Sequence, residues 1–129
     1  MTLKPLLPLV ALAALPGCAV IPQPSTPVLP EGSAVALNQS VAGGGLVATP
    51  LEVVKDDRCP ANVQCIRAGE VIVKTRISDG QQAATKDLTL GEAAEVLGYP
   101  VRLATVTPAK MTNATIAARD YRFTYELVN

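Results

Sequence analysis

Apolar and polar side chains alternate regularly in two stretches of the chain. In residues 70–77, apolar or small side chains occupy every second position, and in residues 121–128 these positions are aromatic or aliphatic. A period of two is the pattern of a strand with one face in the core and the other in water. The positions predicted to face the core are Val71, Val73, Thr75, Ile77, Tyr121, Phe123, Tyr125 and Leu127.

Weaker alternation predicts four further strands, over residues 35–41, 46–55, 85–90 and 99–106. Glycines 43–45 and the sequence Ser78-Asp79-Gly80 predict turns. We expect residues 91–98 to form a short irregular connection, and residues 109–118 to form a surface loop. Short strands without a sustained helix predict an all-β fold for residues 33–129. The expected architecture is a small antiparallel β-sandwich of immunoglobulin-like type, and a small open β-barrel is the alternative.

The N-terminal segment has the pattern of a secretory signal. Lys4 precedes an apolar run over residues 6–15, which is too short to span a bilayer. The sequence Leu15-Pro16-Gly17-Cys18 follows, and it resembles the lipobox of bacterial lipoproteins, in which the cysteine is diacylated before cleavage. The resemblance implies a lipoprotein signal peptide over residues 1–17 and lipidation of Cys18. Ordinary signal cleavage nearby, with Cys18 as a free thiol, is the alternative.

Residues 18–32 have the composition of a tether that follows the lipidated cysteine. The segment contains Pro22, Pro24, Pro27 and Pro30 among small and polar residues, and this density of proline favours an extended polyproline II conformation. We expect it to hold the domain away from the membrane. The alternative is a proline-rich ligand for a partner's groove. Ala19 resembles the outer-membrane sorting pattern, which implies the periplasmic face of the outer membrane in a Gram-negative host.

Charge and composition exclude several classes of function. The chain has 11 Lys and Arg against 11 Asp and Glu, and loss of Lys4 with the signal leaves a net charge of about −1. Neither nucleic acid nor an anionic surface is therefore an expected partner. Histidine is absent, which excludes Ser-His-Asp and Cys-His catalytic sites. Tryptophan is absent as well, so few rings are available to stack on a sugar or a base.

Cys59 and Cys65 lie in the most specific stretch of the chain, D-D-R-C-P-A-N-V-Q-C-I-R-A-G-E over residues 56–70. Behind a secretion signal these cysteines lie in an oxidising compartment, so we expect a disulfide. Closing this short loop contributes roughly 2–2.5 kcal/mol in the chain-entropy model. Redox-active pairs usually have C-x-x-C spacing before a helix, and zinc would need two further ligands. The sequence therefore favours a structural disulfide.

The same stretch resembles the D-x-R-C-P-x-x-V-x-C-x-x-A-G signature of a group of small bacterial secreted and lipid-anchored proteins. After Asp56 or Asp57, the matching residues are Arg58, Cys59, Pro60, Val63, Cys65, Ala68 and Gly69. The sequence Asp120-Tyr121-Arg122 also lies where the group has it, although members usually have tryptophan in place of Arg67. The resemblance spans most of the chain from about residue 35. It implies the fold and the compartment, and the group has no established activity.

Five charged residues around the two cysteines form a candidate binding cluster: Asp56, Asp57, Arg58, Arg67 and Glu70. Together they could hold a charged partner or, through their carboxylates, a cation. A calcium site needs more oxygen ligands at shorter spacing. In the alternative interpretation the aspartates accept N–H groups of a turn, and the arginines pair with neighbouring acids. Glu92 and Glu95 could form an acid/base pair, but we expect them to be solvated surface residues.

The sequence therefore predicts a non-enzymatic binding or interaction module in the cell envelope. Its expected partners are the membrane, through lipidated Cys18, and an envelope protein. The alternative is a thiol- or metal-responsive periplasmic protein that uses Cys59 and Cys65. We expect no catalytic residue, no bound metal and no cofactor.

Overall fold

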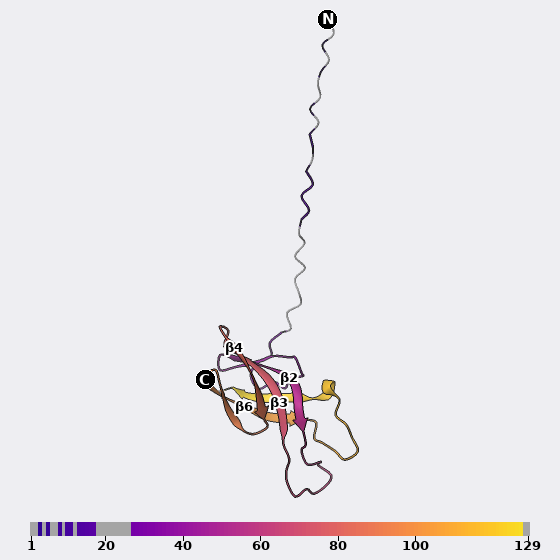
Figure 1. Cartoon of the computed structure of the whole chain (residues 1–129), viewed down its shortest axis with the longest axis vertical. Helices are drawn as coiled ribbons and strands as arrows, with labels where there is room; N and C mark the ends of the chain where they lie inside the picture. The colour runs from indigo at the N-terminus through magenta and orange to yellow at the C-terminus, as the bar shows by residue number, and fades with distance from the viewer. Residues whose placement is uncertain are drawn as a thin grey trace.

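The computed structural model describes residues 3, 5, 8, 10, 11, 13–17 and 27–127, and within them two antiparallel sheets (Figure 1). The first sheet contains β1 (Val41–Gly43), β2 (Leu46–Asp56), β3 (Val71–Ser78) and β4 (Ala83–Thr89), in that order. The second contains β5 (Ala93–Val96), β6 (Tyr99–Thr107) and β7 (Arg122–Leu127), again in that order. The short 3-10 helix η1 (Ala118–Asp120) precedes β7.

The two sheets share one hydrophobic core, which confirms the predicted antiparallel β-sandwich, and they do not close into a barrel. Within each sheet every strand pairs with its neighbour in sequence, so the connectivity is a meander and differs from the Greek-key order of an immunoglobulin domain. Short turns join β1 to β2, β3 to β4 and β5 to β6, whereas residues 57–70 and 108–121 form longer loops. The turn between β1 and β2, for example, has two glycines, Gly44 and Gly45, at φ 55° and 78°.

The predicted alternation in β3 and β7 is confirmed by burial. Its core-facing positions, from Val71 to Ile77 and from Tyr121 to Leu127, are all buried. Phe123 is fully buried at the centre of the sandwich. The hydroxyl groups of Thr75 and Tyr125 lie 2.9 Å apart and form a hydrogen bond between β3 and β7 inside the core. This bond satisfies two polar groups that would otherwise be costly to bury.

Two segments differ from the sequence-based expectation. Residues 93–96 form strand β5, where an irregular connection was expected. The turn that joins β5 to β6 has Leu97 at φ 54°, a conformation that leucine rarely adopts, so the residue type did not indicate a hairpin. At the other end, Val35 forms only an isolated bridge with Phe123, and the first strand begins at Val41.

One edge of β2 lacks a strand partner along much of its length. β1 pairs with β2 only as far as Ala48, and beyond this residue no described strand pairs on that side. The register with β3 shifts twice in this part of β2, between Pro50 and Glu52 and between Val53 and Lys55. An open groove of about 530 Å³ runs along the edge. Its apolar lining comes from Leu37, Leu51, Val53, Val54, Ile116 and Tyr121.

The proposed lipidation site, Cys18, and residues 19–26 of the expected tether lie outside the described residues. Leu29 lies beside β1: its N–H donates to the carbonyl of Ser40, and its carbonyl accepts from Ala42, both at 2.9 Å. The chain thus contacts the domain before residue 33, where the sequence placed the start of the domain. Among the residues that are described, no helix is long and apolar enough to cross a bilayer.

Candidate functional site

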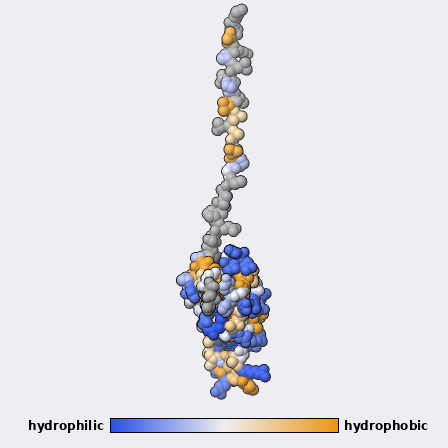
Figure 2. Space-filling view, turned by 90° about the vertical axis from the view of Figure 1, so that its left-hand side faces the viewer, coloured by the Kyte–Doolittle hydropathy of each residue, from blue (hydrophilic) through white to orange (hydrophobic). Residues whose placement is uncertain are grey.

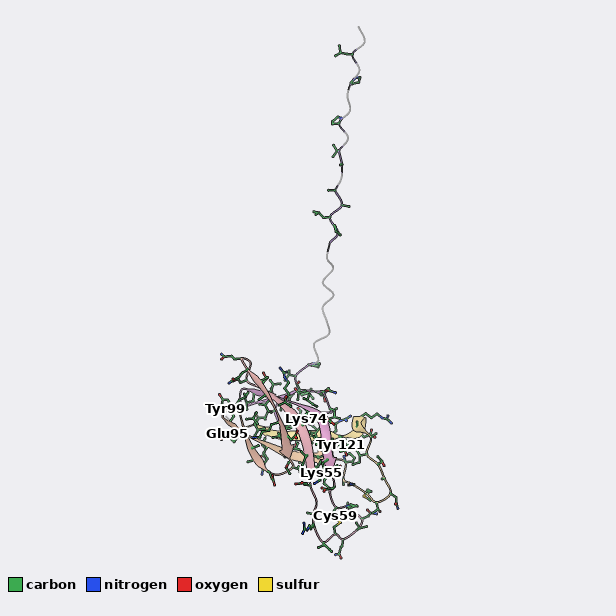
Figure 3. All side chains as sticks on the ribbon, in the orientation of Figure 1. Lys55, Cys59, Lys74, Glu95, Tyr99 and Tyr121 are labelled. Atoms are coloured by element: carbon green, nitrogen blue, oxygen red, sulfur yellow. A yellow bond between two sulfur atoms is a disulfide. The ribbon has the colours of Figure 1, made fainter. Side chains whose placement is uncertain are left out.

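The cysteine-containing loop, residues 57–70, is an extension of the hairpin formed by β2 and β3. The N–H of Asp57 donates to the carbonyl of Glu70 at 2.9 Å, and the N–H of Cys59 donates to that of Ala68 at 2.8 Å. Beyond these bonds the disulfide between Cys59 and Cys65 closes the loop, with the two Cα atoms 5.9 Å apart. The loop projects from one end of the sandwich, and Figure 3 shows Cys59 near its end. The predicted disulfide is therefore present.

Gly69 explains why the two arms of the loop can lie so close together. Its φ is +69°, which side chains other than glycine rarely adopt. A Cβ atom at this position would lie 2.0 Å from the carbonyl oxygen of Asp57. Only glycine fits this position without displacing the backbone of the opposite arm.

Asp56 and Arg58 form a nearly buried ion pair on the inner side of the hairpin. The Nε and one terminal nitrogen of Arg58 donate to the two carboxylate oxygens of Asp56, each at 2.8 Å. The hydroxyl of Tyr121, just before β7, donates to the same carboxylate at 2.8 Å. The Asp56 and Arg58 side chains are only 9% and 13% exposed. Such a bidentate, charge-assisted arrangement is much stronger than a surface ion pair.

The same pair attaches the loop to the second sheet. Arg58 also donates to the backbone carbonyls of Val106 at 3.0 Å and Pro108 at 3.2 Å, at the end of β6. Lys110 donates to the backbone carbonyl of Asp56 at 2.6 Å. These bonds join residues far apart in sequence, so the inner side of the hairpin is fastened to the opposite sheet.

The contacts among Asp56, Arg58 and Tyr121 determine their pKa values. The hydrogen bonds from Arg58, followed by that from Tyr121, lower the pKa of Asp56 to about 2. Its partner Arg58 has a raised pKa, chiefly because of the bond to Asp56. Burial, together with the bond to the carboxylate, raises the pKa of Tyr121 to about 12. At neutral pH the site is therefore an ionised pair with a neutral tyrosine, and none of these groups is poised to exchange a proton.

Asp57 and Glu70 lie on the outer side of the hairpin, because successive side chains of an extended chain point to opposite faces. Lys55 joins them, with its Nζ 3.2 Å from Asp57 and 3.0 Å from Glu70. Asp57 also accepts the N–H of Glu70 at 2.6 Å, and this bond is the main reason that its pKa is lowered. The three side chains are about half exposed, so water screens their attraction.

The five residues of the predicted charged cluster thus occupy three places. Asp56 and Arg58 pair on the inner side, Asp57 and Glu70 meet through Lys55 on the outer side, and Arg67 lies apart from both. Arg67 makes no hydrogen bond or ion pair with any residue that the structure describes. Sequence reasoning did not identify Lys55, Lys110 or the hydroxyl of Tyr121 as partners, because their contacts depend on which strands meet in space.

The acids proposed as a possible acid/base pair lie outside the hairpin, on the surface of the domain. Glu92 and Glu95 are exposed, the first just before β5 and the second within it. Within the described part of the chain, no group of three or more Cys, Asp or Glu side chains is placed to hold a metal ion. The groove beside β2 reaches the Asp56 and Tyr121 side chains, whose polar atoms are already bonded to Arg58 and to each other.

Comparison with models of known protein families, with curated proteins and with solved structures finds no match for this chain.

Proposed function

We propose that the chain is an envelope lipoprotein whose β-sandwich is a non-enzymatic binding or interaction module. In this proposal the signal over residues 1–17 is removed, Cys18 is lipidated and attaches the chain to the membrane, and the proline-rich residues that follow act as a tether. In a Gram-negative host the expected location is the periplasmic face of the outer membrane.

The binding-module proposal rests on one observation: the charged groups on the inner side of the hairpin bond to one another and to the second sheet. Asp56, Arg58 and Tyr121 satisfy one another and fasten the loop to the second sheet. Active sites usually direct such groups into a cavity, with at least one pKa moved toward neutrality. Here the pKa of Asp56 is lowered and the pKa of Tyr121 is raised, so each moves away from neutrality. The arrangement instead supports a rigid loop held out from the domain.

The lipoprotein part of the proposal is tested by the intact mass of the protein extracted from membranes. We expect a chain that begins at Cys18 and carries the added mass of several acyl chains, since these would make attachment effectively permanent. Cys18→Ser is the matched control and should release the protein from the membrane fraction. An unlipidated chain cleaved elsewhere would contradict this part of the proposal and leave the binding module untouched.

A thiol-responsive function is the second candidate, and the position of the disulfide favours it. Cys65 and the residues around it are exposed at the end of the loop, where a reductant or a reductase could reach them. Alkylation of new thiols after mild reduction of the native protein separates the two candidates. Labelling only after unfolding supports a structural disulfide, whereas rapid labelling with a reversible change in binding supports thiol sensing.

A further inference from the structure

The end of the domain that carries the cysteine loop is also where its exposed apolar side chains gather. Within residues 27–127, five large apolar side chains are strongly exposed: Val28, Val54, Val63, Ile66 and Met111. Three of them belong to the cysteine loop and to the neighbouring loop before η1, and Ile66 is completely exposed. Figure 2 shows apolar and polar surface side by side at this end of the domain. We call Val63, Ile66, Arg67 and Met111 the distal tip.

The distal tip is held in place from several directions. The disulfide closes the loop between Cys59 and Cys65. The side chain of Asn62 donates to the hydroxyl of Thr112 at 2.6 Å and accepts the N–H of Thr112 at 3.0 Å, and Ala61 donates to the carbonyl of Lys110 at 2.7 Å. These bonds place Val63 and Met111 beside a shared contact between the two loops. A surface that is already ordered loses little conformational entropy when it binds.

The charges of the cysteine loop help to decide whether the distal tip binds a protein or a lipid surface. Arg67 is exposed and has no ionic partner among the described residues, so it is free to meet a carboxylate. Within residues 57–70 two acids, Asp57 and Glu70, balance two bases, Arg58 and Arg67. A loop without a net positive charge is not attracted to an anionic bilayer, and the tip also lacks the aromatic side chains that suit a membrane interface. A protein pocket fits these features better than a lipid surface.

The position of the tip agrees with this choice. In Figure 1 the purple segment that begins at residue 27 joins the domain at the end opposite to the cysteine loop. The tip therefore lies at the end of the domain away from the segment that leads toward the N-terminus. Its partner then lies beyond the far end of the domain.

We propose that the distal tip inserts Ile66, with Val63 and Met111 beside it, into an apolar pocket on a protein partner whose rim presents carboxylates to Arg67. This inference deepens the binding-module proposal and rests on it. Burial of an isoleucine side chain that is otherwise in water is large enough to change affinity about tenfold to a hundredfold. A few buried residues usually carry most of the binding energy of an interface, and arginine is often one of them.

The test uses the full chain in its own envelope, with a photo-reactive amino acid in place of Ile66 and, in a separate variant, of Val54. Val54 is a matched control, because it is also exposed and lines the groove beside β2, which is the rival docking surface. We expect a discrete protein adduct from position 66 and none from position 54. The cross-linked protein is then purified and its affinity for the chain is measured.

In that binding assay, Ile66→Ser should weaken affinity at least tenfold and Arg67→Glu should weaken it further, while Val54→Ser changes it less than twofold. Unfolding curves of all variants should coincide, since these side chains are exposed. Adducts with lipid alone, adducts from position 54 alone, or no discrete adduct from position 66 would overturn the distal-tip proposal. Binding through position 54 would still support a binding module, so the two proposals fail separately.

Discussion

Asp56 and Asp57 are adjacent in sequence and identical in chemistry, yet they lie in very different surroundings. Asp56 points to the inner side of the hairpin, where Arg58 and Tyr121 bind both of its carboxylate oxygens. Asp57 points outward and shares Lys55 with Glu70 in contact with water. The strand geometry alone produces this difference, because consecutive side chains alternate between faces. The inner group, Asp56 with Arg58 and Tyr121, should contribute most of the electrostatic stability of the hairpin. The outer group, Asp57 with Lys55 and Glu70, should contribute little.

Substitution of Gly69 should disturb both sides at once and have the largest effect. In Gly69→Ala the new methyl group would overlap the carbonyl oxygen of Asp57, and the positive φ would be strained as well. We expect a loss of about 3 kcal/mol in the free energy of unfolding, measured by urea denaturation. Gly80→Ala is the control, because Gly80 also has a positive φ but has open space around its Cα. Equal losses in the two variants would show that close approach of the arms is unimportant.

Removal of the Arg58 guanidinium should have the second-largest effect on stability. Arg58→Met would leave Asp56 with the hydroxyl of Tyr121 and the backbone N–H of residue 58, and would remove the bonds to the carbonyls of Val106 and Pro108. We expect a loss of about 2–3 kcal/mol, somewhat below the figure for a fully buried pair because Arg58 retains slight exposure. In the control, Arg67→Met, stability should change by less than about 0.5 kcal/mol. If both variants unfold at the same urea concentration, the inner pair does not stabilise the domain.

Lowering the pH should show the same difference between Asp56 and Asp57 in the protein with Arg58 intact. The carboxyl of Asp56 has a pKa of about 2 in the folded protein, against 3.8 for the unperturbed group. Its stabilisation is therefore complete above about pH 4 and is lost as pH falls from there toward 2, with a total of about 2 kcal/mol. Urea titrations between these pH values should show this loss, and Asp56→Asn should flatten the slope. Asp57→Asn should keep most of it, and the reverse result would contradict the assignment.

The smallest effect should come from the outer group. Lys55→Met removes the cation between Asp57 and Glu70, but the hydrogen bond from the Glu70 N–H to Asp57 remains. We expect a change in the free energy of unfolding well below that of Arg58→Met, and smaller still at high salt. Thermal unfolding at low and high ionic strength measures it. A loss comparable to that of Arg58→Met would show that exposure does not separate the two groups.

Much of the fold could be predicted from local patterns. The regular alternation from Val71 to Ile77 and from Phe123 to Leu127 identified two core strands, because a half-buried strand leaves this signature. Strand β5 was missed, since its turn has a leucine at positive φ where asparagine or glycine is usual. The bridge of Val35 to Phe123 was missed for another reason: it depends on a pairing between distant parts of the chain.

The candidate site shows the same division. The oxidising compartment expected behind a secretion signal predicted the disulfide between Cys59 and Cys65, and the acids and arginines near them were found as a set. The partners of these residues could not be predicted. Alternation along the strand separates Asp56 from Asp57, and Tyr121 and Lys110 belong to the second sheet and its loop. Local sequence identifies which side chains are present near a loop, whereas tertiary packing decides which of them meet.

The two register shifts in β2 have a consequence for neighbouring copies of the protein. A long, flat edge strand is a template on which another copy can add a strand, and anchoring would concentrate such copies on one surface. Each shift interrupts the row of backbone donors and acceptors and increases the local twist. β2 therefore supplies a long strand to the sandwich without presenting a continuous edge for lateral aggregation.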